Sequence, residues 1–467
     1  MHWRLGVLML LLPVLAHAQP VSTVEADQTI DLVRQGRIDL LRLELRTARA
    51  AAIVNAENEN HMTPFLAAID ADKPEIFQVL LNVGGNPKDP RALLLAAKRG
   101  ALPYVEMLLA HGASAAAADG EGWTVLHAAC RARSADVVDL LLKKGANPNA
   151  EAKPDGWRPI HEAVARRSPQ VLGVLINDKR TKVLAADAQG WTPLHLAVEA
   201  DAYGTSDDAG ARGHPLVVAL TAAGAKMDAA ASLGETPTSL QRVLTEAERD
   251  TPSLALFAGD GLACLRSGVG AAKDWGGVQC WGAVSREDSP EPVPRLGRVE
   301  QVAIAHQRVC ALSRGTSGAN AVRCWGDNPQ GSLGVGSARG VIDRPMIVPG
   351  LRDAISLGVG NDFSCVVLKD GSVRCWGGGN AGIWHGAAPS KPGQPVTIAG
   401  LSNAVAVATS DNSACVLDKP GKVRCWGHGA LGQLGYGQLH DSATPVEVKL
   451  PGPALALTAG SDHFWAI

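Results

Sequence analysis

The chain has 467 residues, with 44 Lys and Arg against 46 Asp and Glu, so its formal net charge is −2. This balance argues against nucleic acid as the main partner, because phosphate binding depends on a basic surface. Hydrophobic residues make up 46% and charged residues 19%, which excludes wholesale disorder. At about 150 residues per domain, the length suggests roughly three domains. The 11 Trp, beside 3 Tyr and 5 Phe, indicate that Trp belongs to a repeated motif.

Residues 1–18 have the pattern of a secretory signal peptide. Arg4 precedes an apolar run, and Ala16 and Ala18 fit the small-residue cleavage rule. The apolar run is too short to span a bilayer stably. We therefore expect a periplasmic or secreted protein without a membrane span, in an oxidising compartment where cysteines pair.

Residues 24–248 carry a helical repeat, of about six copies with degenerate first and last ones. Its clearest copies begin at Trp123, Trp157 and Trp191, which lie 34 residues apart. After each Trp, the sequence predicts a short helix, a turn and a second helix. A Thr can cap the first helix, Pro suits its first turn, and a late Gly suits a left-handed helix end.

The segments Trp123-Thr124-Val125-Leu126-His127 and Trp191-Thr192-Pro193-Leu194-His195 resemble the ankyrin repeat, with its Thr-Pro-Leu-His signature at a period of about 33. The resemblance implies an α-helical ankyrin solenoid without chemistry of its own, which binds partners on a concave face. About ten residues are inserted near 201–213. This insert predicts a solvated loop beside the binding face; a calcium site is an alternative, although its spacing does not match an EF-hand.

Residues 253–467 follow a second period. Five twelve-residue segments align, and a Cys-Trp-Gly follows each of the first four, at Cys280, Cys324, Cys375 and Cys425. Alternating segments such as 404–407 predict strands. The Cys-Trp-Gly strands and the loop Gly432-Gln433-Leu434-Gly435 resemble regulator of chromosome condensation repeats, which form β-propeller blades.

That resemblance implies an all-β propeller, and this chain departs from the family in having four complete repeats plus a half repeat. We expect an incomplete propeller whose terminal edge is covered by another surface, with self-association through this edge as one option. Eukaryotic members include an exchange factor for a small GTPase. That activity is not transferred, because blade repeats alone do not encode it.

Each propeller repeat contains one pair of cysteines. Cys365 and Cys375 flank a three-residue hairpin loop that ends in Gly371, which would place them opposite one another within disulfide range. Disulfides are favoured over buried thiols, and a metal site lacks the short chelating Cys-x-x-Cys pair. The predicted pairs are Cys264–Cys280, Cys310–Cys324, Cys365–Cys375 and Cys415–Cys425. The ninth cysteine, Cys130, is interpreted as a small buried hydrophobe.

The ankyrin region offers candidate partner-binding residues. Trp123, Trp157 and Trp191 would form a ladder beside the concave face, either as partner anchors or as packing between repeats. Tyr203, in the insert, joins them as a candidate. His127, His161 and His195 recur once per repeat, too far apart to share one metal, and are expected to bond the turn backbone.

These patterns predict a protein-protein interaction scaffold with no catalytic residues, metal or cofactor, which binds a partner through the ankyrin concave face and the propeller surface. No nucleophile elbow, phosphate loop or dinucleotide fingerprint stands in a suitable context. Two alternatives stay open. The chain could be a secreted inhibitor of a hydrolase, or a glycan-acting enzyme that uses the propeller.

Overall fold

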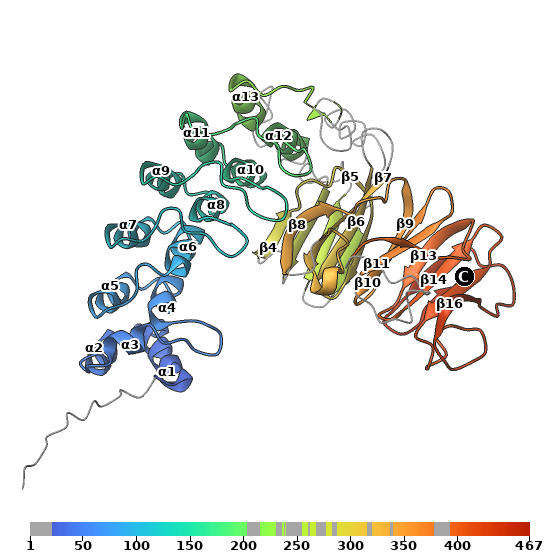
Figure 1. The fold of residues 1–467 in the computed structure, drawn as a ribbon, viewed down its shortest axis with the longest axis horizontal. Coiled ribbons are helices and arrows are strands. Elements are labelled where there is room, and N and C mark those ends of the chain that lie inside the picture. Colours follow the sequence, from blue (N-terminus) through green and yellow to red (C-terminus); the bar gives the residue numbers. More distant parts are fainter. Residues whose placement is uncertain are drawn as a thin grey trace, which may run out of the picture. The chain divides into compact units, whose positions relative to one another are not determined.

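The computed structural model describes residues 21–202, 215–229, 236–237, 239, 255–259, 262–267, 277–282, 287–314, 320–336, 340–377 and 393–467. Helices occupy the described part before residue 223, and strands the part after residue 254 (Figure 1). The chain divides into two compact units, one that ends at Asn147 and one that begins at Pro148. The boundary falls inside the helical repeats, so the second unit contains both helices and sheets.

Within each unit the helices form successive pairs, in which a short inner helix packs on the following outer helix and on the next inner helix of that unit. Such packing joins α4 to α6 and α6 to α8 in the first unit, and α10 to α12 in the second. The first unit contains α1 (Thr23–Arg34), α2 (Ile38–Glu44), α3 (Ala50–Val54), α4 (Pro64–Asp70), α5 (Pro74–Asn82), α6 (Pro90–Lys98), α7 (Leu102–Ala110), α8 (Val125–Arg131) and α9 (Ala135–Lys143). The second contains α10 (Pro159–Ala165), α11 (Pro169–Asn177), α12 (Pro193–Ala202) and α13 (Pro215–Ala222).

Local sequence explains where these helices begin and end. The Thr63 hydroxyl accepts a hydrogen bond from the Leu66 N–H at 3.1 Å, and Pro64 opens α4 without losing a helical bond. Gly145, which follows α9, has a φ of 91°, a conformation that side chains with a Cβ resist. Buried alanines such as Ala67 and Ala128 let neighbouring inner helices approach closely.

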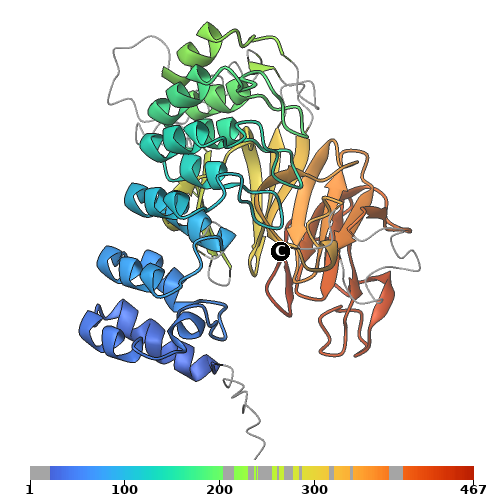
Figure 2. The same ribbon diagram turned by 60° about the vertical axis from the view of Figure 1, so that its left-hand side comes forward.

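In the part of the chain that the structure describes, the strands form four four-stranded antiparallel sheets and one two-stranded sheet, each built from consecutive strands. Figure 2 shows the sheets following one another along the chain toward the C-terminus. The first sheet contains β1 (Ala255–Gly259), β2 (Leu262–Ser267), β3 (Gly277–Gly282) and β4 (Glu287–Pro292); the second contains β5 (Arg298–Ala305), β6 (Arg308–Arg314), β7 (Asn320–Asp327) and β8 (Val341–Ile347). The third contains β9 (Ala354–Val359), β10 (Phe363–Leu368), β11 (Val373–Gly377) and β12 (Val396–Thr397); the fourth contains β13 (Ala404–Thr409), β14 (Ser413–Asp418), β15 (Val423–Gly427) and β16 (Ser442–Glu447). The fifth contains β17 (Leu457–Ala459) and β18 (Phe464–Ala466).

Consecutive sheets pack through their first strands, with β1 on β5, β5 on β9, β9 on β13 and β13 on β17. The cores lie between sheets rather than within one. Trp376 of the third sheet, for example, is buried in a cluster with Cys324 and Val348 of the second. This repetition is that of propeller blades, and it confirms the expected fold class of a helical repeat region followed by an all-β region of propeller-type sheets.

The structure contains the four disulfides expected from the sequence, Cys264–Cys280, Cys310–Cys324, Cys365–Cys375 and Cys415–Cys425. Each joins the second and third strands of one sheet, where the two cysteines stand directly opposite in the register. Their Cα atoms lie 4.0 to 4.1 Å apart. The ninth cysteine, Cys130, is buried in α8, as the sequence indicates, and takes part in none of these disulfides.

Of the helices in the described segments, none combines the length and the apolar character that a membrane crossing requires. The predicted signal peptide, residues 1–18, lies outside the described residues, as do residues 203–213 of the insert. The boundaries proposed for the two repeat regions, 24–248 and 253–467, therefore stay predictions.

Candidate functional site

The ladder of tryptophans does not form one exposed edge. Trp157 is 0% and Trp191 1% exposed, whereas Trp123 is half-buried. The expectation that Trp157 and Trp191 anchor an external partner is therefore corrected, because buried rings are not available to one. Trp123 stays a candidate, and Tyr203 lies outside the described residues.

An aspartate just before each buried tryptophan sets the shape of its loop. Asp187 Oδ1 accepts hydrogen bonds from the N–H groups of Gln189 at 2.8 Å and Trp191 at 2.9 Å. Asp155 Oδ1 accepts one from the Trp157 N–H at 3.3 Å. Such short-range bonds from Asp to the following backbone stabilise tight turns. The second carboxylate oxygen of each aspartate is then left to bind another group.

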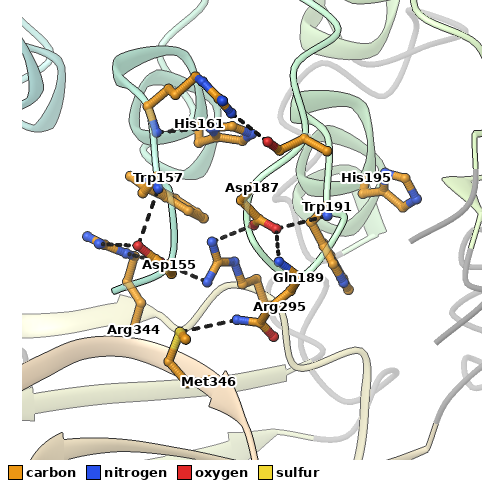
Figure 3. A network of polar contacts seen from close by, with 12 residues as sticks. Asp155, Trp157, His161, Asp187, Gln189, Trp191, His195, Arg295, Arg344 and Met346 are labelled. Carbon is orange, nitrogen blue, oxygen red and sulfur yellow. Dashed lines mark hydrogen bonds and ion pairs between the residues drawn. The ribbon is translucent and has the colours of Figure 1, made fainter. Parts of the chain in front are cut away.

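Arg295, in the connection between β4 and β5, binds both of these oxygens. Its guanidinium donates from Nη1 to Asp155 Oδ2 at 3.0 Å and from Nη2 to Asp187 Oδ2 at 2.5 Å (Figure 3). The side chain is 0% exposed, and its backbone has a φ of 69°. Arg295 thus joins two consecutive helical repeats to the start of the second sheet.

Arg344 in β8 reinforces the same aspartate. Its Nε donates to Asp155 Oδ2 at 3.1 Å and its Nη2 to Asp155 Oδ1 at 3.2 Å, which is a two-bond, planar pairing. The central guanidinium carbons of Arg295 and Arg344 lie 4.1 and 4.9 Å from the centre of the Trp157 ring. The ring therefore contacts two cations, an arrangement that is favourable where water is excluded.

Two further residues of the helical repeats bind the sheet region through its backbone. Glu199 in α12 accepts hydrogen bonds from the N–H groups of Arg295 at 2.5 Å and Gly297 at 2.8 Å. Gln189 donates from Nε2 to the carbonyl oxygen of Pro345 at 3.3 Å. These bonds fix the β4–β5 connection and the end of β8 against the loops that carry the aspartates. We call Asp155, Asp187, Glu199, Arg295 and Arg344, with Trp157, the buried charge network.

Burial and charge act against each other in this network. Burial disfavours the charge of Asp155, but Arg344 and Arg295 outweigh it and hold the pKa of this carboxyl well below its usual range. Burial also disfavours the charge of Arg344, and Asp343 and Asp155 nevertheless raise its pKa above the usual value. At neutral pH both groups are charged, which is the state that the hydrogen bonds require.

The repeated histidines have the structural role that the sequence indicates. The N–H groups of Thr124, Arg158 and Thr192 donate to Nδ1 of His127, His161 and His195, each at 3.1 Å. All three rings are fully buried. Nδ1 is thereby used as an acceptor of the turn backbone, and the proton of the neutral ring belongs on Nε2. Among the residues that the structure describes, no group of three His, Cys, Asp or Glu side chains is arranged to hold a metal ion.

Trp123 lies in a more open setting in the first unit. Its ring centre is 4.8 Å from that of His127 and 5.9 Å from the guanidinium carbon of Arg131. Its backbone N–H donates to Asp119 Oδ1 at 2.9 Å, and the neighbouring Glu121 is exposed. The half-buried ring of Trp123 thus lies between a histidine ring and an arginine cation at the start of α8.

Comparisons with known proteins agree with the two repeat types. A family model for ankyrin repeats matches residues 65–152, and models for the regulator of chromosome condensation (RCC1) repeat match residues 354–383 and 420–467. The chain thus contains ankyrin repeats followed by RCC1 repeats, as the resemblances in the sequence indicate.

Similarity to individual proteins is local. Over 112 residues the chain is 32% identical to the neurogenic locus notch homolog protein 1 of Mus musculus. This alignment covers 23% of this chain and 4% of that protein. It is 42% identical over 67 residues to the 2-5A-dependent ribonuclease of Mus musculus, which covers 14% of this chain and 9% of that protein. The chain therefore spans less than a tenth of the length of these curated relatives.

Among solved structures, Prp20p of Saccharomyces cerevisiae matches 46% of this chain and 55% of its own, with 18% identity and a TM-score of 0.39. Human WBSCR16 matches 46% of this chain and 72% of its own, with 16% identity and a TM-score of 0.34.

Sequence reasoning missed the two arginines and Glu199 of the buried charge network. Neither Arg295 nor Arg344 belongs to the motifs described above, and the neighbouring sequence does not indicate which residue either arginine binds. A weak signal exists in hindsight: both arginines adjoin prolines, Pro294-Arg295 in the connection between β4 and β5 and Arg344-Pro345 within β8. Such a signal identifies locally rigid backbone and not its contacts.

Proposed function

We propose that this protein is an extracytoplasmic scaffold that binds another protein through the concave surface of its ankyrin repeats, centred on Trp123, and through the propeller surface. Trp123 is the observation that carries the ankyrin part of the proposal. Of the three ladder tryptophans it is the one that is not fully buried, and the guanidinium carbon of Arg131 lies 5.9 Å from its ring centre. Partly exposed Trp within a charged surrounding is typical of interaction hot spots.

The buried charge network supports the scaffold role in a different way. It uses Trp157 and the carboxylates of Asp155 and Asp187 to hold repeats and sheets within one unit. Those residues are therefore already occupied, and partner binding falls to surfaces that the network leaves accessible. A scaffold needs such fixed internal contacts, because a rigid surface loses less entropy on binding.

An extracytoplasmic location is supported by two features. The four disulfides belong in an oxidising compartment, and residues 1–18 have the pattern of an export signal. Cell fractionation, combined with alkylation of thiols before lysis, tests the location. Recovery of the protein in the cytoplasm with its propeller cysteines alkylated would contradict it.

The binding surface is tested with Trp123→Ala. Partners are captured by crosslinking in the native compartment, and the affinity of each purified partner for the wild-type and variant chains is then measured. Truncation of a hot-spot aromatic costs about 2 kcal/mol or more, so affinity should fall by roughly thirtyfold. Leu43→Ala is the matched control, because Leu43 is also in the first unit and is 62% exposed. Equal affinities for wild type and Trp123→Ala would remove Trp123 from the interface.

The same captured partners separate the alternatives. A hydrolase whose activity falls on binding would identify the chain as an inhibitor, and turnover of a panel of glycans by the purified chain would identify an enzyme. Both repeat families serve mostly as non-catalytic interaction domains, and this favours the scaffold.

A further inference from the structure

The propeller contains a repeated slot for an indole ring. Trp376, from the third strand of the third sheet, is fully buried against Leu333 and Val348 of the second sheet. Gly334 lies directly beneath its ring: a Cβ there would be 2.4 Å from Trp376 Cδ1, too close for any other residue. Trp325 and Trp426 are likewise buried in clusters with residues of the first and third sheets, respectively. In the second, third and fourth sheets, the third-strand Trp thus packs into the sheet that precedes its own.

The fourth sheet has the same slot in its own residues. Leu434 is fully buried like Leu333, and Gly435 has a φ of 63°, where Gly334 has 75°. The backbone register also agrees, since the Val448 N–H donates to the Val423 carbonyl oxygen at 2.9 Å, as the Val348 N–H does to that of Val322.

The second and fourth sheets differ in the residue that fills the slot. A Cβ on Gly435 would have Val448 Cγ1 as its nearest neighbour, at 2.8 Å, and its three nearest atoms all belong to Val448. Among the residues that the structure describes, no indole lies over Gly435 as Trp376 lies over Gly334. Val348 is 1% exposed, whereas Val448 is only partly buried. The slot opens instead into a groove of about 380 Å³, lined by Leu431, Gly435, Val448, Leu450 and Phe464 among others.

A strand edge borders this groove. β18 occupies the position that β10 and β14 occupy in complete sheets, with Trp465 standing where Cys365 and Cys415 stand. In the third sheet the next strand, β11, pairs Trp376 with Ser364, and in the fourth Trp426 pairs with Ala414. By the same register, a strand added to β18 would place its Trp opposite Phe464. Within the described residues the sheet contains β17 and β18 alone.

We propose that this groove binds an extended strand of another polypeptide chain that carries a Trp-Gly step. The strand pairs antiparallel to β18, and its indole fills the slot over Gly435. Strand addition of this kind takes affinity from main-chain hydrogen bonds and specificity from side-chain pockets. The groove belongs to the second unit and Trp123 to the first, so this proposal goes beyond the scaffold function and does not depend on it.

The structure argues for a foreign strand over a second copy of this chain. Trp325, Trp376 and Trp426 are 2%, 0% and 0% exposed, so a folded copy cannot offer them. Trp281 lies in β3, whose two edges are already paired with β2 and β4. A folded copy therefore has no free strand that carries Trp-Gly among its described residues.

The probe is a synthetic peptide with the sequence of residues 371–378, in which Cys375→Ser prevents disulfide exchange. Binding to the full chain is measured by calorimetry. Saturable binding is expected, and the same peptide with Trp376→Ala should bind at least tenfold more weakly. Hydrogen exchange should slow within residues 457–467 when the peptide binds, because strand pairing protects backbone amides. A peptide that does not saturate, or equal affinity for the two peptides, would overturn the proposal.

Variants of the chain locate the site. Val448→Arg places a charge in the slot and should weaken peptide binding at least tenfold, whereas Val218→Arg, the same change at a residue of α13 that is 52% exposed, should not. Leu431→Asp is the second variant; Leu431 is 72% exposed, so the change spares the core, and it should also weaken binding. Unchanged peptide affinity in both groove variants would refute the assigned site. A dimer of the chain that dissociates when the peptide is added would refute the assigned occupant.

Discussion

Arg295 Nη1 lies 3.0 Å from Asp155 Oδ2, and neither side chain reaches solvent although 140 residues separate them in sequence. Removing two charges from water costs several kcal/mol each, and one ion pair does not reliably repay that cost. Here each charge has further partners, because Arg344 also binds Asp155 and Asp187 also binds Arg295. The network therefore specifies one arrangement of the two repeats and the adjoining sheets, since any shift would leave a buried charge without its partner.

Arg295→Met should lower the free energy of unfolding of the second unit by about 3–5 kcal/mol, because it leaves Asp155 and Asp187 buried with one cation fewer. Urea unfolding followed by hydrogen exchange in residues 148–202 and 287–377 measures this loss. Arg298→Met is the control, since Arg298 makes a partly exposed pair with Glu300 at 3.4 Å, worth about 0–1 kcal/mol. Similar losses for both variants would show that the network contributes no special stability.

His161 should make stability fall with acidity. Burial, and then the charges of Arg295 and Arg158, lower its pKa from 6.5 to about 3. Because the folded state binds this proton less readily than the unfolded chain, the contribution of the neutral ring is complete above pH 6.5 and is lost as the pH falls toward 3. His161 alone should contribute a slope of about 1.4 kcal/mol per pH unit in that window.

The measurement compares the pH dependence of unfolding in wild type and His161→Gln, which should show a flatter curve below pH 6.5. His111→Gln, at an exposed residue, serves as the control and should keep the wild-type slope. A His161→Gln profile that is parallel to wild type would mean that this ring does not titrate as described.

The repeats could be read from the sequence because they depend on local rules. Thr63 and Pro64 mark a helix start wherever they occur, and two cysteines on either side of a short hairpin face each other by register alone. The buried charge network depends instead on contacts between distant segments. Arg295 sits in a connection without a repeated pattern, and its partners come from loops more than a hundred residues earlier.

The tryptophan ladder shows the same limit. Its 34-residue period predicts where Trp123, Trp157 and Trp191 lie along the repeats. It does not predict which of them another part of the chain covers. Arg295 and Arg344 lie against the ring of Trp157, and both Trp157 and Trp191 are buried.

The four disulfides predict how many cysteine thiols react before and after reduction. Under denaturing, non-reducing conditions one thiol per chain, that of Cys130, should react, and all nine cysteines should react after reduction. Replacing Cys365 and Cys375 together by Ala removes a link across ten residues and should cost roughly 3 kcal/mol on the loop-entropy argument. Peptide mapping without reduction checks the pairs. More than one free thiol, or links between different sheets, would contradict the assignment.

Trp157→Ala should mainly lower the stability of the fold, whereas Trp123→Ala should mainly weaken partner binding. Trp157 is fully buried, its Nε1 donates to Glu162 at 2.9 Å, and two guanidinium groups lie against its ring. Truncation of a buried Trp costs about 3–5 kcal/mol, and the bare network would lose the apolar wall that excludes water from Asp155. Trp123→Ala removes a half-buried ring and should cost less stability while it weakens partner binding. Melting temperatures and partner affinities measured on both variants test this difference. A Trp123→Ala variant that melts as early as the Trp157→Ala variant would place both rings in the core of the fold.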